Sequence, residues 1–175
     1  YAFSLSHLLL PKLEVGATVE AHAETGYLGN PYRSIRYRDA AAPGGFGWQV
    51  EQLPTQHSSD AITLRGRYRL AERSNLGLEY RYYRDNWRMA AHTVRANWQL
   101  PLGEDLLLDA GLRHHRQQAA YFHEDLLPSR GSAAGYFSRD PALSTLQDSG
   151  LSLGLRWRFL KSRWHGLEGG TDRKS

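Results

Sequence analysis

The chain has 175 residues, with 22 Lys and Arg against 18 Asp and Glu, a formal net charge of +4, and no cysteine. This length fits one domain with a sizeable core, and the lack of cysteine excludes disulfides and thiolate metal sites. The arginines are spread along the chain without a basic run, so we expect no nucleic acid partner. No apolar run reaches the roughly 18 to 20 residues that a membrane-spanning helix needs.

Alternating apolar and polar residues predict β-strands along the chain. Residues 1–10 alternate weakly, whereas residues 13–24 alternate strictly, with apolar side chains at every odd position. The same period of two returns in residues 62–70, 76–83, 94–100, 106–113 and 152–159. Because successive side chains of a strand point to opposite faces of the sheet, each segment has one apolar and one polar face. The sequence therefore predicts about seven strands.

The connections between these segments differ in length. Residues 10–12, 71–74 and 101–104 are tight turns, whereas residues 25–60 and 119–149 form long segments rich in Gly and Pro. Short turns at one end and long loops at the other indicate antiparallel strands.

The length of the segments and the positions of their aromatic residues favour a membrane protein over a soluble one. Several segments are about 9 to 12 residues long, the length of a tilted strand that crosses a bilayer. Aromatic side chains lie near the segment ends, as in the two interfacial girdles of such barrels; these are Tyr68, Tyr80, Tyr82, Trp87 and Trp98. We therefore predict an all-β, antiparallel, up-and-down transmembrane β-barrel of the bacterial outer membrane, in contact with membrane lipid. A soluble sandwich or lipocalin-like barrel stays open as the alternative, because alternation alone does not exclude it.

The last patterned segment carries a short motif. Ser152, Gly154, Trp157 and Phe159 resemble the C-terminal strand signal that the bacterial outer-membrane insertion machinery recognises. Single-chain bacterial barrels have an even number of strands, so seven strands predict that at least one further N-terminal strand completes a larger barrel. We assign residues 1–160 to the barrel and residues 161–175 to a flexible, polar tail.

Two motifs carry a family resemblance. They are YLGNPYR at residues 27–33 and YRYYRDNW at residues 80–87, accompanied by His92-Thr93 and by QLPLG at residues 99–103. With them the chain resembles the C-terminal half of a family of uncharacterised proteobacterial outer-membrane proteins, over about residues 7–159. Members of that family are about twice this length. The resemblance implies fold and location, but no activity.

The polar faces of the segments are rich in arginine and carboxylate. The residues expected to line the lumen are Arg65, Arg67, Arg69, Arg81, Arg95, Arg113, Arg156 and Arg158 with Glu14, Glu20, Glu79 and Asp109, joined by Glu24. In a narrow barrel they would pair across the lumen and fill it, since buried charges need partners. In a wide one they would line water and favour anions.

These features predict a pore or transport conduit through the outer membrane. A plugged structural or docking barrel that holds a periplasmic protein or lipoprotein is the first alternative, and a barrel enzyme that acts on lipid is the second. The adjacent histidines 114 and 115 fall on opposite faces, and residues 57–60 hold triad residue types only as chain neighbours, whereas triads are assembled between elements. We therefore expect no catalytic residues, metal site or cofactor.

Aromatic residues of the first long loop allow two interpretations. Tyr27, Tyr32 and Trp48 could form a ligand-binding patch, or pack over the mouth of the barrel. We expect the packing.

Overall fold

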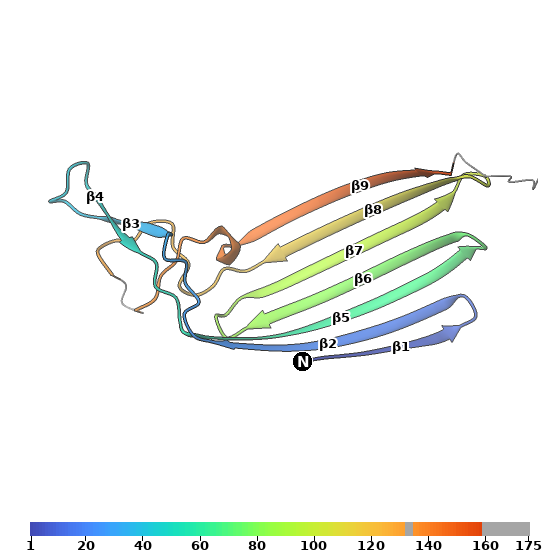
Figure 1. The fold of residues 1–175 in the computed structure, drawn as a ribbon, viewed down its shortest axis with the longest axis horizontal. Helices are drawn as coiled ribbons and strands as arrows, with labels where there is room; N and C mark the ends of the chain where they lie inside the picture. The colour runs from blue at the N-terminus through green and yellow to red at the C-terminus, as the bar shows by residue number, and fades with distance from the viewer. Residues whose placement is uncertain (132–134, 159–175) are drawn as a thin grey trace, which may run out of the picture.

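Residues 1–131 and 135–158 of the chain are described by a computed structural model, and they form an all-β fold. Seven antiparallel strands make one sheet, in which chain neighbours are also sheet neighbours except where a hairpin is inserted (Figure 1). The strands of this sheet are β1 (Ala2–Leu10), β2 (Leu13–Thr25), β5 (Gln56–Ala71), β6 (Ser74–Asp85), β7 (Ala90–Pro101), β8 (Leu106–Gln117) and β9 (Leu146–Trp157). The prediction of an all-β, antiparallel fold is confirmed.

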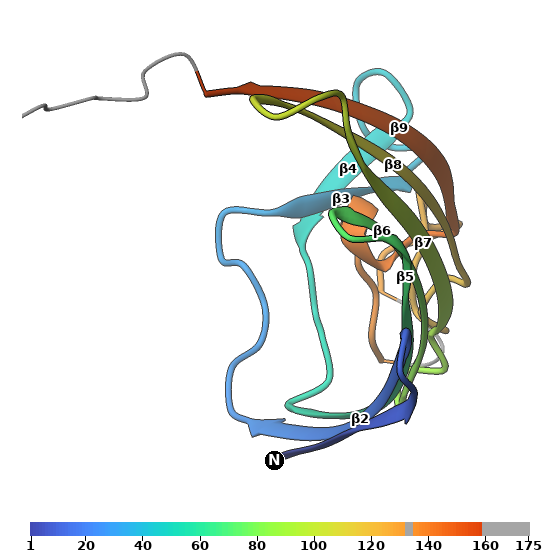
Figure 2. The same cartoon turned by 90° about the vertical axis from the view of Figure 1, so that its right-hand side faces the viewer.

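The sheet is curved and open. Strands β1 and β9 lie at opposite edges, and within the described residues they do not pair with each other. Seen along the strands, the sheet is an arc (Figure 2), and the long connection between β2 and β5 lies beyond the strand ends (Figure 1). This connection contains a separate two-stranded sheet, β3 (Ser34–Arg38) and β4 (Phe46–Val50).

The strands extend further toward the loop end than the alternation predicts. Strand β5 pairs with β2 as far as Gln56 opposite Thr25, six residues before the predicted start at residue 62. Residues 57–60 are polar on both faces, so the apolar pattern stops there although the backbone ladder continues. Hydropathy alternation thus marks only the part of each strand that has an apolar face.

Short and long connections segregate as predicted. Residues 11–12, 72–73 and 102–105 make the turns at one end, which we call the turn end. The connections 26–55 and 118–145 lie at the other, the loop end, where a four-residue turn also joins β6 to β7. A 3-10 helix, η1 (Pro141–Leu143), precedes β9.

Apart from Ala61 and Ala91 on the main sheet, the buried hydrophobic residues among the described residues lie in the hairpin and the connections at the loop end. One cluster contains Trp87, Met89, Ala120 and Phe122. A second packs the hairpin onto the β8–β9 connection, through Ile35, Leu127 and Phe137. These clusters fix the long connections at the loop end.

Candidate functional site

The strand register gives the sheet one polar and one apolar face. Directly paired residues share a face, and the pairing connects Thr18, Thr63, Arg81, Thr93 and His115 across five strands. All three threonines are buried, as expected on the hollow side of the arc. We call this polar face the inner face and the opposite one the outer face.

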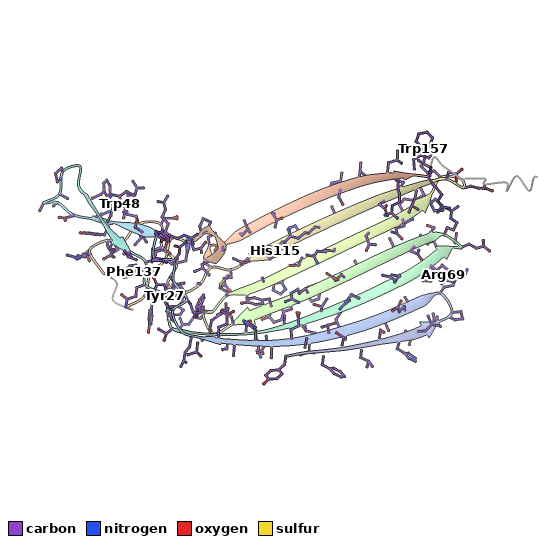
Figure 3. All side chains as sticks on the ribbon, in the orientation of Figure 1. Tyr27, Trp48, Arg69, His115, Phe137 and Trp157 are labelled. Atoms are coloured by element: carbon purple, nitrogen blue, oxygen red, sulfur yellow. The ribbon has the colours of Figure 1, made fainter. Side chains whose placement is uncertain are left out.

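The charged residues predicted to lie together do share the inner face. Arg158 follows the last strand. The others occupy inner positions in the register; they are Arg65, Arg67, Arg69, Arg81, Arg95, Arg113 and Arg156 with Glu14, Glu20, Glu24, Glu79 and Asp109. Figure 3 shows Arg69 at the turn end and His115 nearer the loop end. Asp148 is a further inner carboxylate, which the sequence pattern missed because β9 starts six residues before the predicted segment.

Ion pairs on the inner face join residues of nearby strands along the surface of the sheet. Between adjacent strands the arginine pairs are Arg95 with Glu79 at 2.8 Å, Arg65 with Glu79 at 4.0 Å, Arg156 with Asp109 at 3.7 Å, and Arg113 with Asp148. Arg81 reaches across β5 to pair with Glu20 and donates to the Thr63 hydroxyl on the way, at 3.2 Å. Among the described residues, none of these pairs bridges the hollow of the arc.

A hydrogen-bonded cluster lies at the loop end of the inner face. Its centre is the side chain of Asp85, which is fully buried. One carboxylate oxygen, Oδ2, lies 3.1 Å from His57 Nε2 and accepts from the Tyr83 hydroxyl at 3.1 Å. The other, Oδ1, accepts from the backbone N–H groups of Trp87 and Met89 at 3.0 and 2.9 Å, and so closes the β6–β7 turn. Three residues of the tyrosine-rich motif thus build one cluster.

This cluster borders an apolar hollow of about 290 Å³ that His57, Met89, His115 and Leu143 help to line. The Trp87 and His57 rings contact each other at a tilt of 35°, with their centroids 4.2 Å apart. His115 Nδ1 lies 2.8 Å from the Thr93 hydroxyl oxygen. No group of three or more potential metal-ligating side chains occurs in residues 1–131 and 135–158. Sequence reasoning missed this cluster because His57 and Asp85 are 28 positions apart and meet only through the β5–β6 register.

The outer face is apolar and exposed. Its exposed side chains, each at least one third accessible, include Phe3, Leu5, Val19, Ile62, Leu64, Leu70, Leu76, Leu78, Val94, Leu112, Leu151, Leu153 and Leu155. They come from all seven strands of the main sheet. His114 also lies on this face, bonded to Ser149, so the two adjacent histidines do point apart.

Aromatic residues lie near both ends of the outer face. Tyr68 and Trp98 lie at the turn end, and Tyr80 and Tyr82 lie toward the loop end beside His92. The prediction of an interfacial girdle position is wrong for Trp87, which is only 7% exposed. Its ring packs edge-on against Phe122 and its indole N–H donates to the Gln56 carbonyl, because the β6–β7 turn folds toward the inner side.

The loop aromatics do not pack over the mouth as expected. Tyr27, Tyr32 and Trp48 are exposed, and Figure 3 shows Tyr27 and Trp48 at the loop end, beyond the strands of the main sheet. For Trp48 the reason is the hairpin register, which places Ile35 on the face that contacts Leu127 and puts Trp48 on the opposite face.

The residues of the C-terminal motif divide between the two faces. Ser152 and Gly154 lie on the inner face of β9 and Trp157 on its outer face, at the turn end (Figure 3). Phe159 lies outside the described residues. The match to an insertion signal stays a prediction.

The fold and this site define an all-β protein with an open antiparallel sheet, charged on its hollow side and apolar on its exposed side. In the described part of the chain, no helix is long and apolar enough to cross a membrane. The chain belongs to the family described as "Protein of unknown function (DUF3570)", whose model matches residues 1–168. No curated protein and no solved structure gives a match.

Proposed function

We propose that this chain forms part of the wall of a bacterial outer-membrane β-barrel that conducts small polar solutes through a water-filled lumen lined by arginine and carboxylate. The observation that carries the proposal is the polarity of the curved sheet. Its exposed outer face is apolar and its hollow inner face is charged. A soluble barrel has the opposite arrangement, with an apolar interior, whereas an outer-membrane barrel turns its apolar band to lipid.

The outer face has an apolar band, and the height of this band supports the proposed position in an outer membrane. Toward the loop end it stops at charged outer residues, among them Asp60, Arg84 and Arg116. In β5 it covers residues 62–70, which is about 27 Å along the strand at about 3.4 Å per residue. With the strand tilt of about 40° found in such barrels, the band is about 21 Å tall, close to the roughly 25 Å of outer-membrane barrels.

The geometry of the ion pairs favours a wet lumen over a filled one. Pairs that lie flat between neighbouring strands leave the hollow free, and the Arg65 and Arg95 side chains stay 54% and 53% exposed. Such a lining faces water and sets ion selectivity by its charge. Because Glu24 and Asp148 add to the carboxylates, the described inner face is close to charge balance, so we expect the anion preference to be weak.

One observation favours the plugged or docking barrel as the competing function. Leu28 and Leu53 from the first long connection and Leu143 from the second pack against the buried cluster that contains Trp87 and Phe122. These contacts hold both connections over the loop end, where they would narrow the mouth of a barrel. A barrel closed there would serve as a scaffold for a periplasmic protein or lipoprotein.

Conductance in planar lipid bilayers tests the proposal. We expect discrete conductance steps with weak selectivity. The double variant Arg65→Glu/Arg95→Glu should shift the reversal potential toward cations, because it places carboxylates on the lumen wall. The matched variant Arg84→Glu, on the outer rim, should leave the reversal potential unchanged.

Two results would count against the conduit. Protein that is folded, as shown by migration that changes on boiling, but gives no conductance steps would favour the plugged barrel. Migration in detergent that boiling does not change would contradict a closed barrel.

A further inference from the structure

A second hollow, of about 360 Å³, lies on the inner face between β1, β2, β5 and β6. Small residues make room for it, since Ser6 lies directly opposite Gly16 in the β1–β2 register. Glu14 and Arg67 border it toward the turn end, and Asn97 borders it on the side of β7. The hollow therefore offers hydroxyl, carboxylate and guanidinium groups together.

Two opposite charges in this hollow face each other without touching. Glu14 and Arg67 are direct register partners on the inner face, a position where neighbouring side chains normally contact. Among the described residues, neither makes an ion pair or a hydrogen bond with any side chain, and both are exposed. The other register partners of Glu14 and Arg67 are Leu8 and Gly77, which offer no charge.

The neighbouring charged residues of the inner face, in contrast, already have partners. Arg65, one inner position along β5, donates to the Thr18 hydroxyl at 2.6 Å and lies 4.0 Å from Glu79. Glu79 in turn accepts from Arg95 at 2.8 Å. Since these groups are already engaged, Glu14 and Arg67 are the pair in this hollow that can bind a ligand without breaking a bond on the wall.

We propose that this hollow is a recognition subsite for small zwitterions, solutes of the amino acid and dipeptide class that carry one ammonium and one carboxylate group. The Arg67 guanidinium forks onto the carboxylate, which is the geometry arginine suits best, and the Glu14 carboxylate accepts from the ammonium group. Ser6 supplies a hydroxyl for the peptide or side-chain polar atoms. The proposal rests on the proposed function, because it gives the conducted solutes a chemical class.

Binding of diglycine to the full chain in detergent micelles tests the subsite, with affinity measured by calorimetry at pH 7. Two blocked forms separate the zwitterion from simple ions: N-acetyl-diglycine keeps only the carboxylate, and diglycine amide keeps only the ammonium. Because hydrogen bonds to charged groups are each worth a tenfold change or more, we expect both blocked forms to bind at least tenfold more weakly than diglycine.

Variants locate the binding. Glu14→Gln and Arg67→Gln should each weaken diglycine binding at least tenfold, whereas the exchange Glu14→Arg/Arg67→Glu should stay within about threefold, since the zwitterion can bind in the reverse direction. Arg84→Gln, which removes an exposed arginine from the outer rim, is the matched control and should not change the affinity.

Three results would overturn the inference: no diglycine binding by folded protein, equal affinity for diglycine and its blocked forms, or loss of binding in a folded exchange variant. Failure of the conduit is distinguishable, because the binding assay needs no conductance. A protein that binds diglycine but gives no conductance steps keeps this subsite and loses the conduit. A protein that gives conductance steps but does not bind diglycine keeps the conduit and loses this subsite.

Discussion

An arginine placed on the outer face should cost far more than one placed on the inner face, if the outer face contacts lipid. Leu78 lies at mid-height on β6, on the outer face, and is 58% exposed. Asn97 lies on β7 at the same height, because it pairs with Gly77, and it points to the inner face. The variants Leu78→Arg and Asn97→Arg therefore introduce the same side chain at one depth on opposite faces.

The expected costs of the two variants differ by about 2 kcal/mol. An arginine on the lipid face near the bilayer midplane costs about 2 to 4 kcal/mol in transmembrane barrels. A value of about 3 kcal/mol would lower the folding equilibrium constant more than a hundredfold. In water, replacement of an exposed leucine stays within about 0.5 kcal/mol. For Asn97→Arg we expect at most about 1 kcal/mol, because the side chain can extend over Gly77 into the hollow.

Equilibrium urea unfolding in phosphatidylcholine vesicles, followed by tryptophan fluorescence, measures both costs. Leu78→Arg should lower the free energy of unfolding by at least 2 kcal/mol relative to the unchanged chain, and Asn97→Arg should not. The reasoning would be refuted by a Leu78→Arg cost within 0.5 kcal/mol, or by equal costs for the two variants. Either result would mean that the apolar face does not contact the hydrocarbon.

Two further variants test the loop end. Asp85→Ala should lower the free energy of unfolding by about 3 kcal/mol, since it leaves buried donors without their acceptor and each costs about 1 to 3 kcal/mol; Asp60→Ala, in an exposed pair, should cost less than about 1 kcal/mol in the same urea titration. Equal costs for the two would contradict a structural role for the cluster. Gly47→Ala should speed proteolysis of residues 26–55, because the new Cβ would lie 2.2 Å from the Tyr37 ring and overpacking typically costs about 1 to 3 kcal/mol. Gly150→Ala, where a Cβ meets nothing within 4 Å, should leave cleavage unchanged, and unchanged cleavage of both variants would refute the overpacking.

The strands and their two faces could be predicted from the sequence because the alternation that defines them lies within each strand. The pleat sends successive side chains to opposite faces, so alternation in one strand assigns its faces without reference to any other strand. This is why Arg95 and Glu79 could be placed on one face before any register was known. The register then adds what alternation lacks, namely which of these charges touch: Arg95 contacts Glu79, whereas Arg67 and Glu14 remain apart.

The loop end could not be predicted because its contacts join residues that are distant in the chain. Ile35 and Leu127 are buried against each other from two different connections, and neither segment has a period that predicts the contact. Trp87 was misplaced for a related reason. Its position at the end of an alternating segment is typical of an interfacial aromatic, but the turn after Asp85 rotates it toward the inner side.

The shape of the sheet decides what can cover its apolar face. Soluble monomers rarely expose contiguous apolar patches larger than a few hundred Å². Because this face exposes large apolar side chains on all seven strands, it needs a partner. A second sheet in a sandwich packs about 10 Å away with its strands nearly aligned, and it would have to wrap around the outside of an arc. Lipid chains follow a convex surface without such a constraint. The charged groups, meanwhile, stay on the inner face, where the Arg65 and Arg95 side chains remain half-exposed. Curvature and polarity therefore favour the same arrangement, with hydrocarbon outside and water inside, and the paired leucine and asparagine variants on β6 and β7 measure it directly.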